Sequence, residues 1–223
     1  TPIPTNRDMQ SSFVKNILSE IVEPIQPQFV DYSKEMTVSQ TNKKLPLLYK
    51  HNDLDDLFYL GYQFNFGNTA DNRYGTALGY LDYLGTKKMS ATEFKQRMYK
   101  LACDMSFNVT DNYITIWLSG LSENMPEAMA LLEDLAANAL VDEGAYSNMV
   151  EAIIKSRNDA KSSQDECFSR LSAYGTYGPR NAYTDIMSAQ QLRNTKPAEL
   201  LALVKGLRDM QHTVVYYGPM TQK

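Results

Sequence analysis

Histidine is scarce in this chain, which has only His51 and His212 among its 223 residues. A zinc hydrolase commonly holds its metal with two histidines at positions i and i+4 of one helix. A Ser–His–Asp triad likewise needs a histidine beside its nucleophile, and no Gly-x-Ser-x-Gly motif marks such a serine. The sequence therefore offers no candidate residues for either chemistry.

Cysteine and long apolar runs are also scarce. Cys103 and Cys167 lie too far apart for a Cys-x-x-Cys motif and are too few for a disulfide scaffold, so we expect two buried free thiols rather than one bridge. No apolar run approaches about 18 residues, and no signal-peptide pattern opens the chain, so we expect no membrane span. Because the chain begins with Thr1, any targeting signal would lie upstream, and the compartment stays open.

Charge of one sign is not concentrated anywhere. The chain has 22 basic and 26 acidic residues, which give a net charge of −4. They are spread along the sequence, so no basic surface for nucleic acid is expected. With 43% hydrophobic residues, the chain is long enough to bury a substantial core in one large domain or two small ones.

Residues 1–30 differ from the rest. They contain four prolines around an apolar pattern at helical spacing between about residues 6 and 22. Because Pro24 and Pro27 end that pattern, we predict a linker between domains that carries a short helix, followed by a single domain at 31–223.

The pattern of the remaining residues predicts an α+β domain. Strands are expected at 45–50, 57–66 and 213–217, a hairpin at 107–118, and helices at 69–84, 91–102, 127–140, 144–162, 167–174 and 197–210. Gly85 is expected to cap the first of these helices, and Asn124 with Glu127 to form a capping box. The order of these elements indicates a mostly antiparallel sheet covered on one face by helices.

Two smaller patterns have plain interpretations. Six apolar residues recur at helical spacing within 127–140 and predict a face directed at the core; they are Ala128, Leu131, Leu132, Leu135, Ala136 and Ala139. The acidic run 51–56 lacks the Gly and Glu of a calcium loop, so we expect a solvated polar turn between two strands.

The segment Thr76-Ala77-Leu78-Gly79-Tyr80, followed by Gly85-Thr86, resembles a motif of the insulinase and pitrilysin family (M16) of zinc peptidases. That motif is His-x-x-Glu-His on a helix that runs into a Gly-Thr turn. In the family the first His lies nine residues before that Gly. Counting without gaps therefore places Thr76 and Tyr80 at the two His positions and Gly79 at the Glu position. None of the three supplies a zinc ligand of the family type or a general base.

The resemblance extends over about residues 30–220. Glu151 lies 71 residues after Tyr80, roughly where the family has its distal Glu ligand, so it is either a relic ligand position or a solvated helix residue. Arg180, flanked by Tyr177 and Tyr183, resembles a family segment after the long helices, and this group could bind a peptide carbonyl or carboxylate. Ordinary turn structure is the alternative for this loop.

The resemblance implies an inactive unit of the fold shared by LuxS and mitochondrial processing peptidase. It implies no cofactor in this chain and zinc in the catalytic half of a parent peptidase, either in the same polypeptide or in a separate subunit. The expected role is to form part of a peptide-binding chamber opposite that half and to help hold an unfolded peptide. The alternative is a structural or adaptor subunit of the same descent with no role in proteolysis.

Overall fold

The computed structural model describes residues 9–27 and 29–222. The chain divides into two compact units, residues 1–32 and 33–223. In the first unit, helix α1 (Ser12–Ser19) begins at Ser11, whose hydroxyl accepts a hydrogen bond from the Val14 N–H. This helix is shorter than the predicted range of 6–22, of which residues 6–8 lie outside the described residues.

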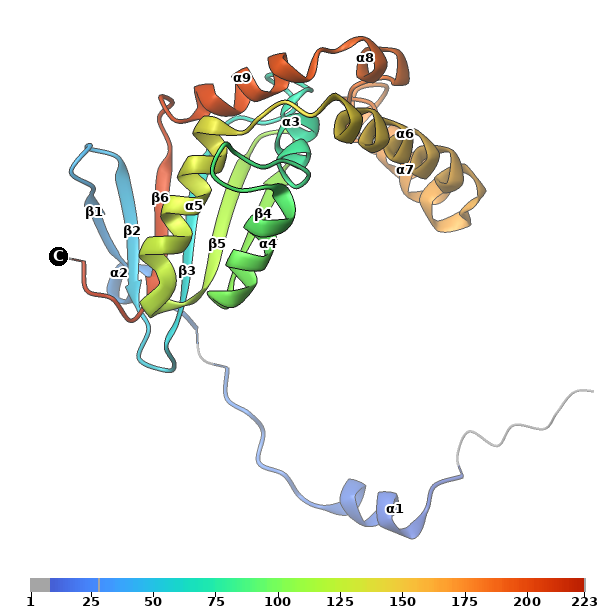
Figure 1. Ribbon diagram of the computed structural model, residues 1–223. Coiled ribbons are helices and arrows are strands. Elements are labelled where there is room, and N and C mark those ends of the chain that lie inside the picture. Colours follow the sequence, from blue (N-terminus) through green and yellow to red (C-terminus); the bar gives the residue numbers. More distant parts are fainter. Residues whose placement is uncertain (1–8, 28, 223) are drawn as a thin grey trace, which may run out of the picture. The chain divides into compact units, whose positions relative to one another are not determined.

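A single sheet forms the framework of the second unit (Figure 1). Its strands, in the described residues, are β1 (Thr37–Gln40), β2 (Pro46–His51), β3 (Leu57–Phe64), β4 (Cys103–Val109), β5 (Ile114–Leu121) and β6 (Thr213–Gly218). They lie in the order β1-β2-β6-β3-β5-β4, with β2 and β6 parallel and the other neighbours antiparallel. The prediction of a mostly antiparallel sheet is confirmed, although β1 was not expected.

Helices cover one face of this sheet. The described helices of the second unit, with α2 at its start, are α2 (Tyr32–Glu35), α3 (Tyr74–Leu81), α4 (Ala91–Lys100), α5 (Met125–Asn138), α6 (Glu143–Asp159), α7 (Gln164–Tyr177), α8 (Ala189–Asn194) and α9 (Pro197–Leu207). Figure 1 shows α3, α4, α5 and α9 over the same face, whereas α6 and α7 extend away from the sheet. This layering confirms the predicted α+β fold. No helix in the described ranges is long and apolar enough to cross a membrane.

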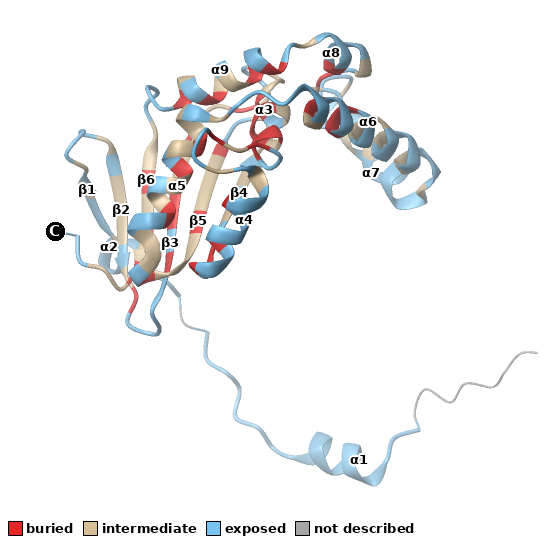
Figure 2. Ribbon diagram, viewed as in Figure 1, coloured by how far each residue is buried: buried red, intermediate tan, exposed pale blue. Residues whose placement is uncertain are grey.

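The core lies between the sheet and these helices, where Figure 2 shows the buried residues gathered. The stripe predicted on α5 faces it: Ala128, Leu132 and Leu135 are buried, and the other three members pack against them partly buried. Residues of the strands, such as Phe58 and Leu118, belong to the same buried core. Burial of this apolar area stabilises the unit by about 25 cal/mol per Å².

Two predicted helix ends are wrong. Helix α3 ends at Leu81 with Asp82 at its cap, before Gly85. At Gly85 a Cβ would lie 2.5 Å from the Met89 carbonyl oxygen, so this glycine permits a close backbone approach instead of capping the helix. Asn124 precedes α5 without capping it, because its amide donates to the Leu101 carbonyl at 2.8 Å.

Two expectations about exposure also need correction. Cys103 is buried as predicted, but Cys167 is exposed, and both thiols are free. The turn at 51–56 connects β2 and β3, yet Asn52 in it is buried instead of solvated. Its side chain bonds to Asp55 and Tyr217, which satisfies its polar atoms away from water.

Candidate functional site

Tyr80, which the motif spacing assigns to the second histidine position, has a structural role. Its side chain is fully buried, its hydroxyl donates to the Asp142 carbonyl at 2.7 Å, and it accepts from the Asp142 N–H at 2.9 Å. Burial raises the pKa of this phenol, and the hydrogen bond from Asp142 opposes the rise. The Tyr146 ring lies edge-on to it, with centroids 5.3 Å apart. The phenol thus joins α3 to the start of α6.

The other motif positions provide no replacement ligand. Thr76 and Gly79 lie on α3, and a Cβ built at Gly79 would meet no atom within 4 Å. Glu151 is an exposed residue of α6 whose carboxylate pairs with Arg193 at 3.1 Å. Among the described residues no group of three or more His, Cys, Asp or Glu could hold a metal ion. The family's zinc does not fit these side chains.

The predicted peptide-binding loop is internally paired. The Arg180 guanidinium lies 2.9 Å from Asp185 and donates to the Thr69 carbonyl at 3.4 Å. Tyr177 is exposed at the end of α7, while the ring of Tyr183 lies under the Arg170 guanidinium, 4.9 Å from its centroid. The Arg180 guanidinium therefore has an ion-pair partner within its own loop, in Asp185. Peptide binding by Arg180, Tyr177 and Tyr183 stays a prediction.

Strand β4 forms an open edge of the sheet. At one end of the pairing between β4 and β5, the Ala102 carbonyl accepts a hydrogen bond from the Leu121 N–H. At the other end, the Thr110 N–H donates to the Tyr113 carbonyl. These two bonds fix which residues of β4 form hydrogen-bonded pairs with β5. The even-numbered residues of β4 therefore direct their main-chain groups at β5. The N–H and C=O groups of odd-numbered residues, Met105 and Phe107 among them, point outward. In the described chain β4 pairs with β5 alone.

A groove runs along this edge between β4 and α3. Its volume is about 450 Å³. One side of the groove is formed by α3 and its cap, with Gly75, Leu78, Gly79 and Asp82. The other side is formed by residues 105–109 of β4. Because Gly79 has no side chain, helix α3 leaves room beside the strand at this residue. We call this the edge groove.

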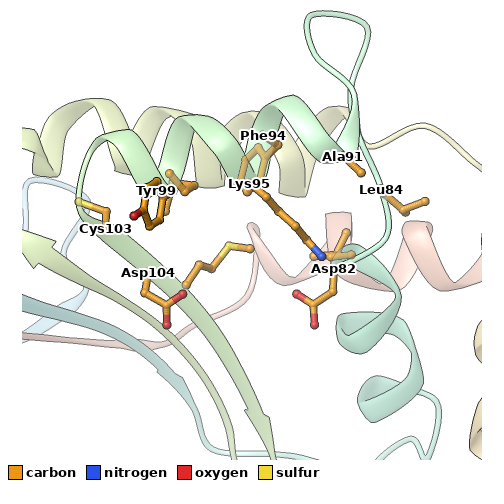
Figure 3. A pocket seen from close by; sticks show the side chains of 11 residues that line it. Asp82, Leu84, Ala91, Phe94, Lys95, Tyr99, Cys103 and Asp104 are labelled. Carbon is orange, nitrogen blue, oxygen red and sulfur yellow. The ribbon is translucent and has the colours of Figure 1, made fainter.

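A second hollow, of about 330 Å³, adjoins the edge groove between α4 and β4. Apolar side chains line its inner part, including Leu84, Phe94 and Met98. Figure 3 shows Lys95 extending from α4 toward Asp82, with Asp104 on β4 across the space. Burial raises the pKa of the Asp82 carboxyl; Lys95 lowers this pKa and Asp104 raises it further. We call this the acidic hollow.

Comparison with solved structures identifies the fold. The periplasmic protease PqqL from Escherichia coli aligns with 100% of this chain and 25% of its own, at 13% identity and a TM-score of 0.69. A peptidase M16 inactive domain from Pseudomonas fluorescens aligns over 84% of this chain and 47% of its own, at 14% identity and a TM-score of 0.69. Pitrilysin aligns over 90% of this chain and 23% of its own, at 16% identity and a TM-score of 0.60.

The chain has the fold of an M16 peptidase unit. No protein-family model and no curated protein sequence matches it, so the likeness rests on structure. The chain spans about a quarter of PqqL and about half of the Pseudomonas domain. Sequence reasoning missed the edge groove and the acidic hollow of this M16-like unit, because both depend on which strand lies at the edge of the sheet.

Proposed function

We propose that this M16-like unit is a non-catalytic part of a zinc peptidase and forms part of the peptide-binding chamber opposite the catalytic half. The observation that supports the proposal is the buried Tyr80, whose hydroxyl bonds to Asp142. The motif spacing assigns this residue to the position of a zinc ligand. A chamber needs two matching walls, but only one of them needs the metal. The second wall can therefore lose its ligands and still orient the substrate.

The open edge of β4 supports a direct role in holding peptide. Outward-pointing main-chain groups on an edge strand can pair with an extended peptide, which then adds a strand to the sheet. Such binding depends little on the peptide's sequence, because main-chain hydrogen bonds supply the contacts. An unfolded substrate would lie in the edge groove beside Gly79, where the helix leaves space.

The first test is the composition of the endogenous protein. Capture with an antibody to this segment, followed by peptide mass spectrometry, is expected to recover a His-x-x-Glu-His peptide from the same polypeptide or from a bound subunit. Recovery of a free chain with no peptidase partner would contradict the proposal and favour a structural or adaptor subunit instead.

The second test compares two glycines. Gly79 and Gly175 are both helical and both have open space at the Cβ position, but of these two only Gly79 lines the edge groove. Gly79→Phe is expected to weaken binding of a labelled Thr/Val-alternating peptide of about ten residues by about tenfold or more. Gly175→Phe is the matched control and is expected to bind as the unmodified chain does.

Hydrogen exchange locates the peptide in the same experiment. We expect the amides of Met105 and Phe107 to gain protection when the peptide is added, and a peptide N-methylated at alternate residues to lose binding. Equal binding by the two phenylalanine variants, or protection confined to β1, would contradict strand addition at β4.

A further inference from the structure

We propose that the acidic hollow selects a lysine or arginine side chain from the peptide strand paired with β4. This inference rests on the proposed function, since it assumes a peptide in the edge groove. The two spaces share Asp82 and Met105 in their linings. A side chain of the added strand that points to the helical face could therefore enter the hollow from the groove.

The lining suits a long cationic side chain. Leu84, Phe94 and Met98 are buried and supply apolar surface for an aliphatic stem. The exposed residues Asp82 and Asp104 line the same hollow (Figure 3). Lysine and arginine commonly bury their stems on apolar surface while the charged end reaches polar groups. A norleucine side chain would gain the same apolar contact but would add no cation to the one that Lys95 already supplies.

The charges in the hollow are not balanced internally. Two carboxylates and one ammonium group, that of Lys95, line the hollow, and all three belong to exposed residues. Within the described residues neither Asp82 nor Asp104 has an ion-pair partner within 4.0 Å. The Lys95 ammonium lies 6.0 Å from the centroid of the Tyr83 ring. Burial is the largest cause of the raised pKa of Asp82; Lys95 opposes this rise only in part, and Asp104 adds to it. A cation from the peptide would supply the missing charge.

The test uses the full chain and four labelled Thr/Val-alternating peptides that differ at one central residue: lysine, arginine, norleucine or glutamate. We expect the lysine and arginine peptides to bind about threefold to fivefold more tightly than the norleucine peptide, as for a partly exposed ion pair. The glutamate peptide is expected to bind most weakly. Added salt should reduce these differences, because it screens exposed charges.

Substitutions in the hollow give the matched control. The double variant Asp82→Asn with Asp104→Asn keeps the shape of the lining and is expected to bind the lysine and norleucine peptides equally. Asp165→Asn, on the exposed first turn of α7, changes net charge away from the hollow and should keep the preference for lysine.

The outcomes separate the two proposals. If all four peptides protect the amides of β4 and bind equally, charge selection is wrong and strand addition stands. If the lysine preference survives in the double variant, the cation binds elsewhere and the inference is also wrong. If no peptide protects β4, strand addition itself fails, and with it the role of the hollow.

Discussion

The Tyr80 phenol bonds to both main-chain groups of Asp142, whose carbonyl also accepts from the Tyr146 N–H. Tyr80→Phe keeps the ring but takes the hydroxyl partner from the Asp142 N–H, which should lower the free energy of unfolding by about 1 kcal/mol or more. Urea denaturation measures the loss. Tyr59→Phe, at a half-exposed tyrosine of β3, is the control and should change stability little. Equal stability of the two variants would show that the phenol of Tyr80 is dispensable.

At this scale the sequence predicts residue types at the motif positions but not the contacts that they make. The spacing to Gly85 assigns Thr76, Gly79 and Tyr80 to these positions. It could not predict the bond between Tyr80 and Asp142, because 62 residues separate them. The residue types around Arg180 allowed either a peptide-binding group or an ordinary turn. They did not predict its ion pair with Asp185, five residues away, because that pair depends on the local backbone geometry.

Elements depend on glycine in two opposite ways. Gly79 lies within α3 with open space at its Cβ position, so Gly79→Ala should stabilise the unit by about 0.5–1 kcal/mol by restricting the unfolded chain. Gly120 of β5 has a φ of +148°, and a Cβ there would lie 2.3 Å from the Ala102 carbonyl oxygen. Gly120→Ala should therefore destabilise by at least about 1 kcal/mol.

Thermal or urea unfolding of the two alanine variants measures whether Gly79→Ala raises stability and Gly120→Ala lowers it. A loss of stability in Gly79→Ala would mean that the face of α3 beside the edge groove is more crowded than the structure indicates. Unchanged stability in Gly120→Ala would mean that β5 and the turn at Ala102 can move apart without cost.

The long elements could be predicted because their patterns are strong, as with the apolar stripe of α5. The short elements β1 and α8 could not, since four residues and six residues are too few to show a period. The Gly85 and Asn124 interpretations failed for a different reason. Both residues are typical of helix caps. Gly85 instead allows the backbone at Met89 to approach closely, and the Asn124 amide bonds to Leu101, and the sequence reveals neither contact.

On the scale of the whole molecule, the order of the strands creates the candidate site. Strands β3, β5 and β4 lie side by side although α3 and α4 intervene in the sequence. This order leaves β4 at the edge and brings α3 and α4 against it, which forms the edge groove and the acidic hollow. Sequence periodicity predicts each element but not the order of strands, so neither space could be predicted.

Stability is also distributed unevenly across the molecule. Helices α6 and α7 extend away from the sheet (Figure 1), and α7 contains no buried residue, whereas α5 lies on the core. Leu171 of α7 is 68% exposed, and Leu132 of α5 is 4% exposed. The same substitution should therefore cost different amounts: Leu132→Ala about 2–5 kcal/mol and Leu171→Ala less than about 0.5 kcal/mol.

Urea denaturation of the two variants measures this difference, and hydrogen exchange provides an independent check. Amides of α7 should exchange through local opening at low free energy, because little apolar contact holds the helix, while those of α5 should require global unfolding. Similar costs at Leu132 and Leu171 would show that α7 is packed against a partner in solution, such as another copy of this chain. In that case the urea midpoint of the unmodified protein should rise with protein concentration, because association stabilises the folded state by mass action.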